Sequence, residues 1–204
     1  MVLAARRENL LLQTSTECMK LGAPAVVPVP CDITQDVGRE RAALALGELP
    51  NDLEPCLVNN AGIGEFGPFS DMKGPDIDSQ IQTNLVGTIA LTHRVLPLFA
   101  NGGRMINVLS VAASVPLSGA AVYGASKAGL RMFGLVLQAE LRSQGVVITN
   151  LLPGATSTDM WSENSPREDM LPPEALAETI AWLLALPKDR VVEEMSLMPP
   201  KGIL

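Results

Sequence analysis

The 204-residue sequence has few aromatic residues, few cysteines and a single histidine. Aromatic residues make up 3% of the chain, so its hydrophobic core must be built mainly from Ala, Val, Leu, Ile and Met. The cysteines, Cys18, Cys31 and Cys56, lack the spacing of metal ligands, so we expect no metal site. Their odd number indicates a reduced, intracellular chain.

Long runs of basic or apolar residues are also missing. The formal net charge is −7, and no run of Lys or Arg is long enough to follow a phosphate backbone, so nucleic acid is not an expected partner. No uninterrupted apolar run reaches the roughly 18 residues of a membrane span. The first residues, MVLAARREN, hold too short an apolar stretch for a signal peptide. We therefore expect a cytoplasmic protein that does not enter a membrane.

Apolar residues are nevertheless abundant, at 47% of a length that suits one domain, residues 1–204, with a sizeable core. Short apolar runs alternate with helical patterns, which predicts an α/β fold with a doubly wound, Rossmann-like parallel sheet. The expected strands are 2–5, 25–30, 56–60, 104–109, 146–152 and 194–198. The expected helices are 8–21, 38–49, 76–99, 121–143 and 173–186, and the polar segment 156–171 is expected to be an ordered loop or lid.

Tyr123 and Lys127 give the sharpest chemical signal, because a spacing of four puts both side chains on one face of a helix. A tyrosine hydroxyl has an ordinary pKa near 10, and a neighbouring ammonium group lowers that pKa, so Lys127 would make Tyr123 a usable acid or base. Ser110 ends an apolar strand at the sheet edge where doubly wound folds bind ligands, so its hydroxyl could hold a carbonyl oxygen. Taken alone, such a Tyr–Lys pair usually only lies along the protein surface.

The motif NNAG follows an expected strand, and its small residues let a cofactor approach the backbone, although a plain turn would need similar residues. NNAG, the YxxxK spacing, a serine thirteen positions before the tyrosine, and a Pro-Gly pair followed by a threonine together resemble the short-chain dehydrogenase/reductase family. The resemblance covers essentially the whole chain. It rests on Asn59, Asn60, Ala61, Gly62, Ser110, Tyr123, Lys127, Pro153, Gly154 and Thr158.

The resemblance implies a role for each catalytic residue. Tyr123 acts as the general acid or base, while Lys127 lowers the pKa of Tyr123 and binds the nicotinamide ribose. Ser110 orients the carbonyl group of the substrate. Asn84 matches the family's asparagine that holds a water molecule in a proton relay toward the lysine. The alternative for Asn84 is an ordinary polar residue at a bend in the helix.

The resemblance also implies a dinucleotide cofactor bound against the NNAG residues, Tyr123 and Lys127. Asp32 would accept a hydrogen bond from the adenine amino group, although Asp32 or Thr34 could instead cap the next helix. Pro153, Gly154 and Thr158 match the family's loop over the nicotinamide carboxamide and the phosphates. Arg6, and less so Arg7, lies where a basic residue meets the 2′-phosphate, which favours NADP over NAD unless these arginines are only solvated.

One part of the family pattern is missing. The family begins with a strand, a TGxxxGxG turn and a helix that faces the pyrophosphate, and none of these precedes Val2. We expect an N-terminally truncated chain that lacks about one βα unit, with two unpaired strand edges inside its sheet. The expected function is hydride transfer between NADP(H) and a carbonyl or secondary alcohol substrate. The alternative is a non-catalytic interaction or heterodimer partner. The resemblance also implies a homodimer or homotetramer formed through helices 76–99 and 121–143.

Overall fold

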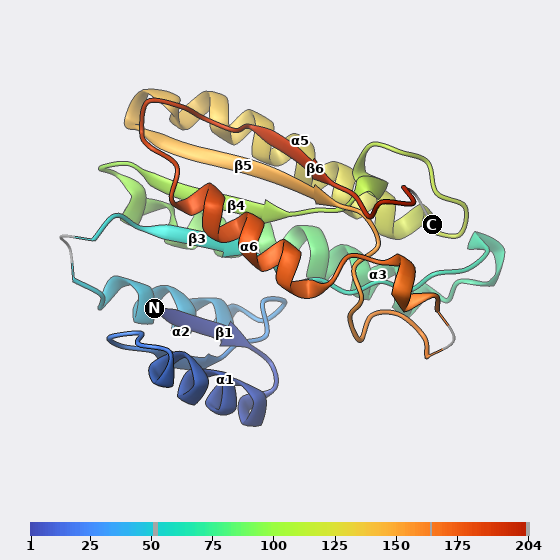
Figure 1. The fold of residues 1–204 in the computed structure, drawn as a ribbon, viewed down its shortest axis with the longest axis horizontal. Coiled ribbons are helices and arrows are strands. Elements are labelled where there is room, and N and C mark those ends of the chain that lie inside the picture. The colour runs from blue at the N-terminus through green and yellow to red at the C-terminus, as the bar shows by residue number, and fades with distance from the viewer. Residues whose placement is uncertain (51–52, 164, 203–204) are drawn as a thin grey trace.

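The computed structural model describes residues 1–50, 53–163 and 165–202, and its strands confirm the expected α/β class. All strand pairs are parallel (Figure 1). The first group is β1 (Val2–Ala5) paired with β2 (Val27–Pro30). The second group contains, in spatial order, β3 (Cys56–Asn59), β4 (Gly103–Val108), β5 (Val146–Pro153) and β6 (Glu194–Leu197).

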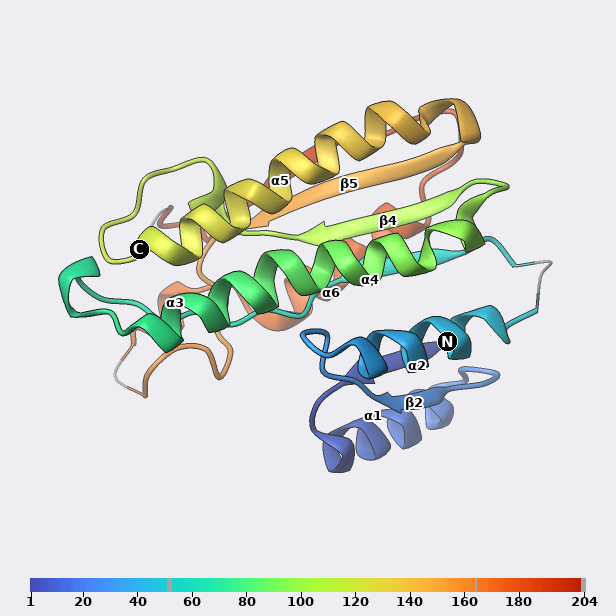
Figure 2. The same cartoon turned by 180° about the vertical axis from the view of Figure 1, so that it is seen from behind.

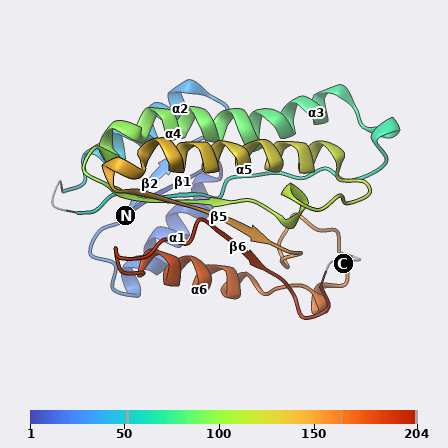
Figure 3. The same cartoon turned by 90° about the horizontal axis from the view of Figure 1, so that it is seen from above.

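Helices cover both faces of the sheet, as the alternating sequence pattern predicts (Figure 3). One face carries α2 (Asp36–Gly47), α3 (Gly74–Ile81), α4 (Thr88–Val95) and α5 (Ala121–Leu141). The other face carries α1 (Glu8–Lys20) and α6 (Pro173–Leu184). In Figure 2, α4 and α5 lie next to each other over the sheet. Within the described ranges, no helix has the length and apolar character needed to cross a membrane.

The sheet is interrupted between β1 and β3. Among the described residues, β1 is hydrogen-bonded only to β2, and β3 only to β4, which matches the two unpaired edges expected from the sequence. The order is that of a doubly wound sheet without a strand at its centre. The two groups are connected through helices, since the Arg94 guanidinium on α4 lies 2.6 Å from the Asp36 carboxylate on α2.

The expected helix 76–99 is divided into four segments. Between α3 and α4 the chain forms a π-helical turn, Gln82–Gly87, and α4 is followed by a 3-10 turn, Leu96–Phe99. Pro97 explains the second change, because it has no N–H to continue the α-helical bonding pattern. The π-helical turn contains Asn84, and such turns occur often at functional sites.

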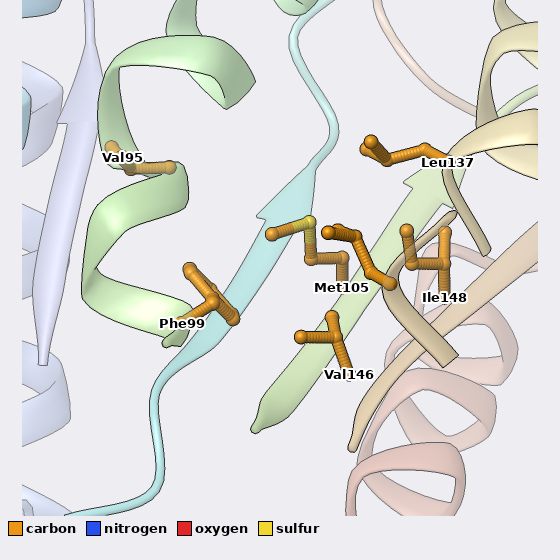
Figure 4. Close-up of a cluster of buried hydrophobic side chains, with 7 residues drawn as sticks. Val95, Phe99, Met105, Leu137, Val146 and Ile148 are labelled. Carbon is orange, nitrogen blue, oxygen red and sulfur yellow. The ribbon is translucent and has the colours of Figure 1, made fainter. Parts of the chain in front are cut away.

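The largest apolar cluster fixes α4 and α5 against the sheet. Val95 and Phe99 contribute from the α4 side, and Leu137 from α5 (Figure 4). They pack against strand residues of β4 and β5, which include Met105, Val146 and Ile148. Burying each such side chain contributes about 1.5–3 kcal/mol, so this cluster holds the helix that carries Tyr123 and Lys127 in place.

A row of buried asparagines fixes the register of three strands. Asn59, Asn107 and Asn150 are direct neighbours on β3, β4 and β5. The Asn59 amide donates to Asn107 Oδ1 at 3.0 Å, and the Asn107 amide donates to Asn150 Oδ1 at 3.0 Å. A Cβ at Gly134 of α5 would lie 2.3 Å from Asn150 Oδ1, so only glycine lets the helix approach this row. The row therefore aligns the carboxyl ends of the three strands, where the site residues begin.

Candidate active site

Ser110, Tyr123 and Lys127 meet beyond the carboxyl end of β4. Tyr123 and Lys127 lie one turn apart on α5, with exposures of 8% and 4%, and Ser110 follows β4 by two residues. The backbone of Ser110 is extended, and its Oγ accepts a hydrogen bond from the N–H of Ala112 at 3.2 Å. A hydrogen bond between the Ser110 and Tyr123 side chains acts to lower the pKa of Tyr123. The structure thus brings together the three side chains that the sequence motif singles out.

Lys127 is a buried ammonium group without a carboxylate partner among the described residues. Its Nζ donates to the carbonyl oxygen of Val108 at 2.9 Å and lies 5.8 Å from the centre of the Tyr123 ring. Burial lowers the pKa of Lys127 to about 8, because a charged amine is poorly solvated there. At neutral pH the group is therefore still mostly protonated, but close to the range in which it loses its charge.

The pKa of Tyr123 is shifted in the opposite direction from the expectation. Burial raises this pKa above its ordinary value of 10.0, and it outweighs the lowering by the Ser110 hydrogen bond. Lys127 is not a cause of the shift in this arrangement. The physical reason is that desolvation penalises the phenolate directly, whereas the Lys127 ammonium group points to the Val108 carbonyl. Burial consequently favours the neutral, protonated form of Tyr123.

Asn84 connects the loop after β3 to the catalytic helix. Its Oδ1 accepts from Ile63 N at 2.8 Å, and its amide donates to Ile63 O at 2.8 Å and to Ser126 Oγ at 3.1 Å. Ser126 in turn donates to the carbonyl oxygen of Tyr123 at 2.7 Å. A Cβ at Gly62 would lie 3.3 Å from both Asn84 Oδ1 and Lys127 Nζ. Asn84 is therefore a central residue of the site, while its water relay stays a prediction.

The four residues of the NNAG segment differ in their exposure and in their contacts. Asn60 and Ala61 are exposed at the end of β3, and Gly62 is half-buried, so these three residues are accessible to a ligand. Asn59 is different, because its side chain is buried and donates to Asn107 and to Thr92 Oγ1 at 3.1 Å. Its side-chain amide is thus used inside the sheet, and the binding of the cofactor by Asn59 stays a prediction.

Arg6 and Asp32 lie together at the carboxyl ends of β1 and β2. The positive charge of Arg6 contributes to lowering the pKa of Asp32, although the larger causes are hydrogen bonds from Thr34. Asp32 accepts from Thr34 N at 2.9 Å and from Thr34 Oγ1 at 2.8 Å. Neither Asp32 nor Thr34 caps α2, because the residue before its first turn is Gln35, and Gln35 makes no side-chain cap. The capping alternative is therefore wrong, and the binding of a cofactor by Arg6 and Asp32 stays a prediction.

The segment after β5 contains the remaining expected cofactor residues. Pro153 is buried as the last residue of β5, and the Gly154 N–H donates to Leu197 O at 2.8 Å. A Cβ at Gly154 would lie 2.7 Å from Pro199, so glycine is required where these chains pass. Thr158 is exposed, and its Oγ1 accepts weakly from Met160 N at 3.4 Å. Gly154 thus has a packing role, and Thr158 presents its side chain at the surface.

The nicotinamide half of a dinucleotide fits these residues better than the pyrophosphate does. Lys127 Nζ comes close to Gly62, whose small size leaves room beside the ammonium group. The helix after β1, in contrast, begins with the acidic Glu8, and Arg7 before it makes no side-chain cap. In residues 1–50, 53–163 and 165–202, no glycine-rich turn leads from a strand into a helix N-terminus as a phosphate cradle. The same residues contain no group of three potential metal ligands.

Two aromatic residues that the sequence analysis did not single out lie near Tyr123: Phe66 lies beside its ring, and Trp161 is stacked on Phe66. The ring centres of Phe66 and Tyr123 are 5.3 Å apart at an angle of 59°, and those of Phe66 and Trp161 are 5.7 Å apart at 5°. Trp161 belongs to the segment 156–171, which is closed at its base by a bridge between Thr156 and Leu171. In the sequence, the only sign of this aromatic group was a tryptophan within a polar segment of a chain poor in aromatics.

The chain is similar to known proteins along nearly all of its length. A family model described as short chain dehydrogenase matches residues 1–169. A sepiapterin reductase of Chlorobaculum tepidum is 32% identical over 206 residues, which cover 99% of this chain and 84% of the reductase. A serine 3-dehydrogenase of Agrobacterium fabrum is 34% identical over 181 residues, which cover 82% of this chain and 72% of that enzyme. A solved alcohol dehydrogenase of the archaeon Thermococcus sibiricus, complexed with 5-hydroxy-NADP, has a TM-score of 0.88 at 26% identity, over 96% of this chain and 84% of that chain.

Proposed function

Because the chain belongs to the short-chain dehydrogenase family, we propose that it is an NADP(H)-dependent oxidoreductase that interconverts a carbonyl compound and a secondary alcohol. The observation that carries the proposal is the meeting of Ser110, Tyr123 and Lys127 at the carboxyl end of β4. The relatives named above are reductases and dehydrogenases, and one solved relative holds 5-hydroxy-NADP.

In the proposed reduction, Ser110 and Tyr123 hold the carbonyl oxygen, and Tyr123 donates a proton to that oxygen as the alcohol forms. The bound nicotinamide supplies the hydride that reaches the carbonyl carbon. Burial raises the pKa of Tyr123, so its phenol is protonated at neutral pH and has a proton to donate. Lys127 lies one helical turn from Tyr123, with its Nζ 5.8 Å from the centre of the ring, where its ammonium group would bind the nicotinamide ribose.

The first test replaces the proton donor. We expect Tyr123→Phe to lower the turnover of NADPH-dependent carbonyl reduction by about 10²–10⁴-fold, the usual contribution of a positioned acid. Far-UV circular dichroism and thermal melting serve as the control for folding. A Tyr123→Phe variant that keeps wild-type turnover would refute the assigned role.

The pKa of the donor can be measured separately, because Tyr123 is the only tyrosine in the chain. Phenolate absorbance during an alkaline titration therefore reports on this residue alone. We expect a midpoint above 10, and a still higher midpoint in Ser110→Ala, since the Ser110 hydrogen bond lowers the pKa. A midpoint below 10 would show that the charge of Lys127 outweighs burial.

The preference for NADP rests on Arg6 at the end of β1 beside Asp32. An arginine there attracts the 2′-phosphate, which NAD lacks. We expect Arg6→Ala to raise the KM for NADPH while leaving the KM for NADH nearly unchanged. Arg7→Ala is the matched control, since Arg7 is the next residue and is exposed as Arg6 is. Equal effects of Arg6→Ala on both cofactors would favour NAD as an equivalent cofactor.

Oligomer formation is part of the same proposal. The exposed face of α5 is lined by small or apolar residues, Ala121, Ala125, Ala128, Met132 and Val136. Covering such a face with a second copy would remove apolar surface from water. Light scattering coupled to size-exclusion chromatography should therefore give the mass of a homodimer or homotetramer. Met132→Glu should shift that mass toward the monomer.

A second candidate function follows from the interrupted sheet and from the lack of a phosphate cradle in the described ranges. A non-catalytic chain could associate with an intact homologue and need no nucleotide of its own. Calorimetric titration of the purified chain with NADPH separates the two candidates. Saturable binding supports the enzyme, whereas stable association with an intact homologue without nucleotide binding supports the partner.

A further inference from the structure

Three aromatic residues of this chain lie next to one another. Phe66, Tyr123 and Trp161 are three of only seven aromatic residues, with Phe66 between the other two. Phe66 is 44% exposed, so part of its ring remains in contact with solvent next to the proton donor. Leaving a large apolar ring exposed beside a reactive group forgoes burial energy unless a ligand covers it.

Hydrogen bonds fix the loop that carries Phe66 to α3, to the π-helical turn after it and to the segment just before α5. Asn84 binds both backbone groups of Ile63, and the Glu65 N–H donates to Gln80 Oε1 at 3.1 Å. The Gly67 N–H donates to Gly119 O, just before α5, at 2.9 Å. These bonds hold the backbone on both sides of Phe66, and the ring therefore has a defined position relative to Tyr123.

Trp161 comes from a separate segment that is also held by hydrogen bonds. Its N–H donates to Thr158 O at 3.2 Å, and its carbonyl oxygen accepts from Arg167 Nη2 at 3.0 Å. Gly64 allows the two segments to meet, because a Cβ there would lie 2.8 Å from the Phe66 ring and 3.3 Å from Met160 Sδ. The resulting wall is built from two rings, a thioether and a glycine.

We propose that Phe66 and Trp161 form an apolar clamp for the group attached to the reacting carbonyl, so that the enzyme prefers neutral aryl or alicyclic carbonyl compounds over carboxylates. The proposal rests on the proposed oxidoreductase function and deepens it to a substrate class. With the carbonyl oxygen held at Tyr123, a substituent on the adjacent side packs against Phe66, and Trp161 extends this surface.

The chemistry of the clamp decides between neutral and charged substituents. A flat apolar group gains dispersion and burial against the two rings. A carboxylate in the same position would lose its hydration without an ionic partner, because the Arg167 guanidinium is directed to the Trp161 backbone carbonyl. The clamp therefore strengthens the binding of flat apolar substituents and also disfavours the binding of carboxylates.

The activity test compares acetophenone, propanal and acetoacetate as substrates with NADPH. We expect the highest kcat/KM for acetophenone and the lowest for acetoacetate. Phe66→Ala and Trp161→Ala should each raise the KM for acetophenone by about tenfold, as expected for a lost aromatic contact, and change kcat/KM for propanal less than about twofold. Phe69→Ala and Trp182→Ala are matched controls, since these exposed rings lie outside the clamp.

A binding test makes the inference independent of turnover. In Trp182→Phe, Trp161 is the only tryptophan, so its fluorescence reports on ligands at the clamp. We expect acetophenone to quench this fluorescence at concentrations about tenfold lower than benzoate, which carries the same ring with a carboxylate. We also expect Phe66→Ala to weaken the quenching by acetophenone.

The possible outcomes separate the clamp from the proposed function. Acetophenone binding without any NADPH-dependent reduction would refute the function and keep the clamp. Reduction of acetophenone that is unaffected by Phe66→Ala and Trp161→Ala, or equal binding of benzoate, would refute the clamp and keep the function. A carboxylate preference that disappears in Arg167→Met would also overturn the clamp, because Arg167 would then be the specificity residue.

Discussion

The buried charge of Lys127 should make the stability of this protein depend on pH in a defined way. Lys127 has an ordinary pKa of 10.5 in the unfolded chain and about 8 in the folded one. The folded protein therefore binds fewer protons than the unfolded chain between these values, and the free energy of unfolding rises with pH in this window. Below pH 8, the charged lysine costs about 3 kcal/mol relative to its neutral form.

The magnitude can be calculated for a practical interval. Between pH 7.5 and 9.5, two pKa values of 10.5 and about 8 predict a gain of about 2 kcal/mol in the free energy of unfolding. The raised pKa values of Tyr123, Cys31 and Cys56 act in the opposite direction above pH 9. These three groups are also present in a Lys127 variant, so the difference between the two proteins isolates the lysine.

The assay is urea unfolding at both pH values, followed by far-UV circular dichroism, for the wild type and Lys127→Met. At a single pH the comparison is ambiguous, because the variant also loses the hydrogen bond to Val108 O, which costs about 1–3 kcal/mol. The change with pH is not ambiguous: the wild type should gain about 2 kcal/mol relative to the variant. Lys20→Met, at an exposed lysine, should behave as the wild type.

A parallel pH dependence of the wild type and Lys127→Met would refute this reasoning. It would mean that the ammonium group is solvated or paired in solution and that its pKa is ordinary. The same result would weaken the mechanism, since a lysine that titrates near pH 8 should also make carbonyl reduction decline above that pH. The stability and activity profiles therefore test one property by two independent measurements.

The asparagine row and a surface ion pair give two further predictions. Gly134→Ala should lower the free energy of unfolding, measured by thermal melting, by about 1–3 kcal/mol, because the new Cβ would lie 2.3 Å from Asn150 Oδ1. The control is Gly74→Ala, which has open space around it and should change the free energy of unfolding by less than about 0.5 kcal/mol. An equal effect of both would refute the crowding argument. Glu194→Gln should lower the free energy of unfolding by less than about 1 kcal/mol at low salt, since the ion pair of Glu194 with Arg131, at 2.6 Å, is partly exposed. This difference between variant and wild type should vanish in high salt, or at a pH below the lowered pKa of Glu194. A loss that persists in high salt would show that packing is responsible.

The candidate site residues could be found from the sequence because their signal is local. The four-residue spacing of Tyr123 and Lys127 follows from the helical repeat, and Ser110 is marked by the end of an apolar strand. Asn84 required the family resemblance, since nothing in its neighbourhood predicts a π-helical turn. The interruption of the sheet was predictable only through the resemblance, because the family's first strand and glycine-rich turn do not precede Val2.

The sequence by itself therefore determined the α/β class and singled out Ser110, Tyr123 and Lys127 as candidate site residues, since each depends on periodicity or on short spacings. Only the tertiary structure decided which asparagine of NNAG points into the sheet, because Asn59 is bound by residues on other elements, Asn107 and Thr92. It also decided the direction of the Tyr123 pKa shift, which is set by burial. The stacking of Phe66 on Trp161 joins segments far apart in the chain, and such contacts arise only from packing.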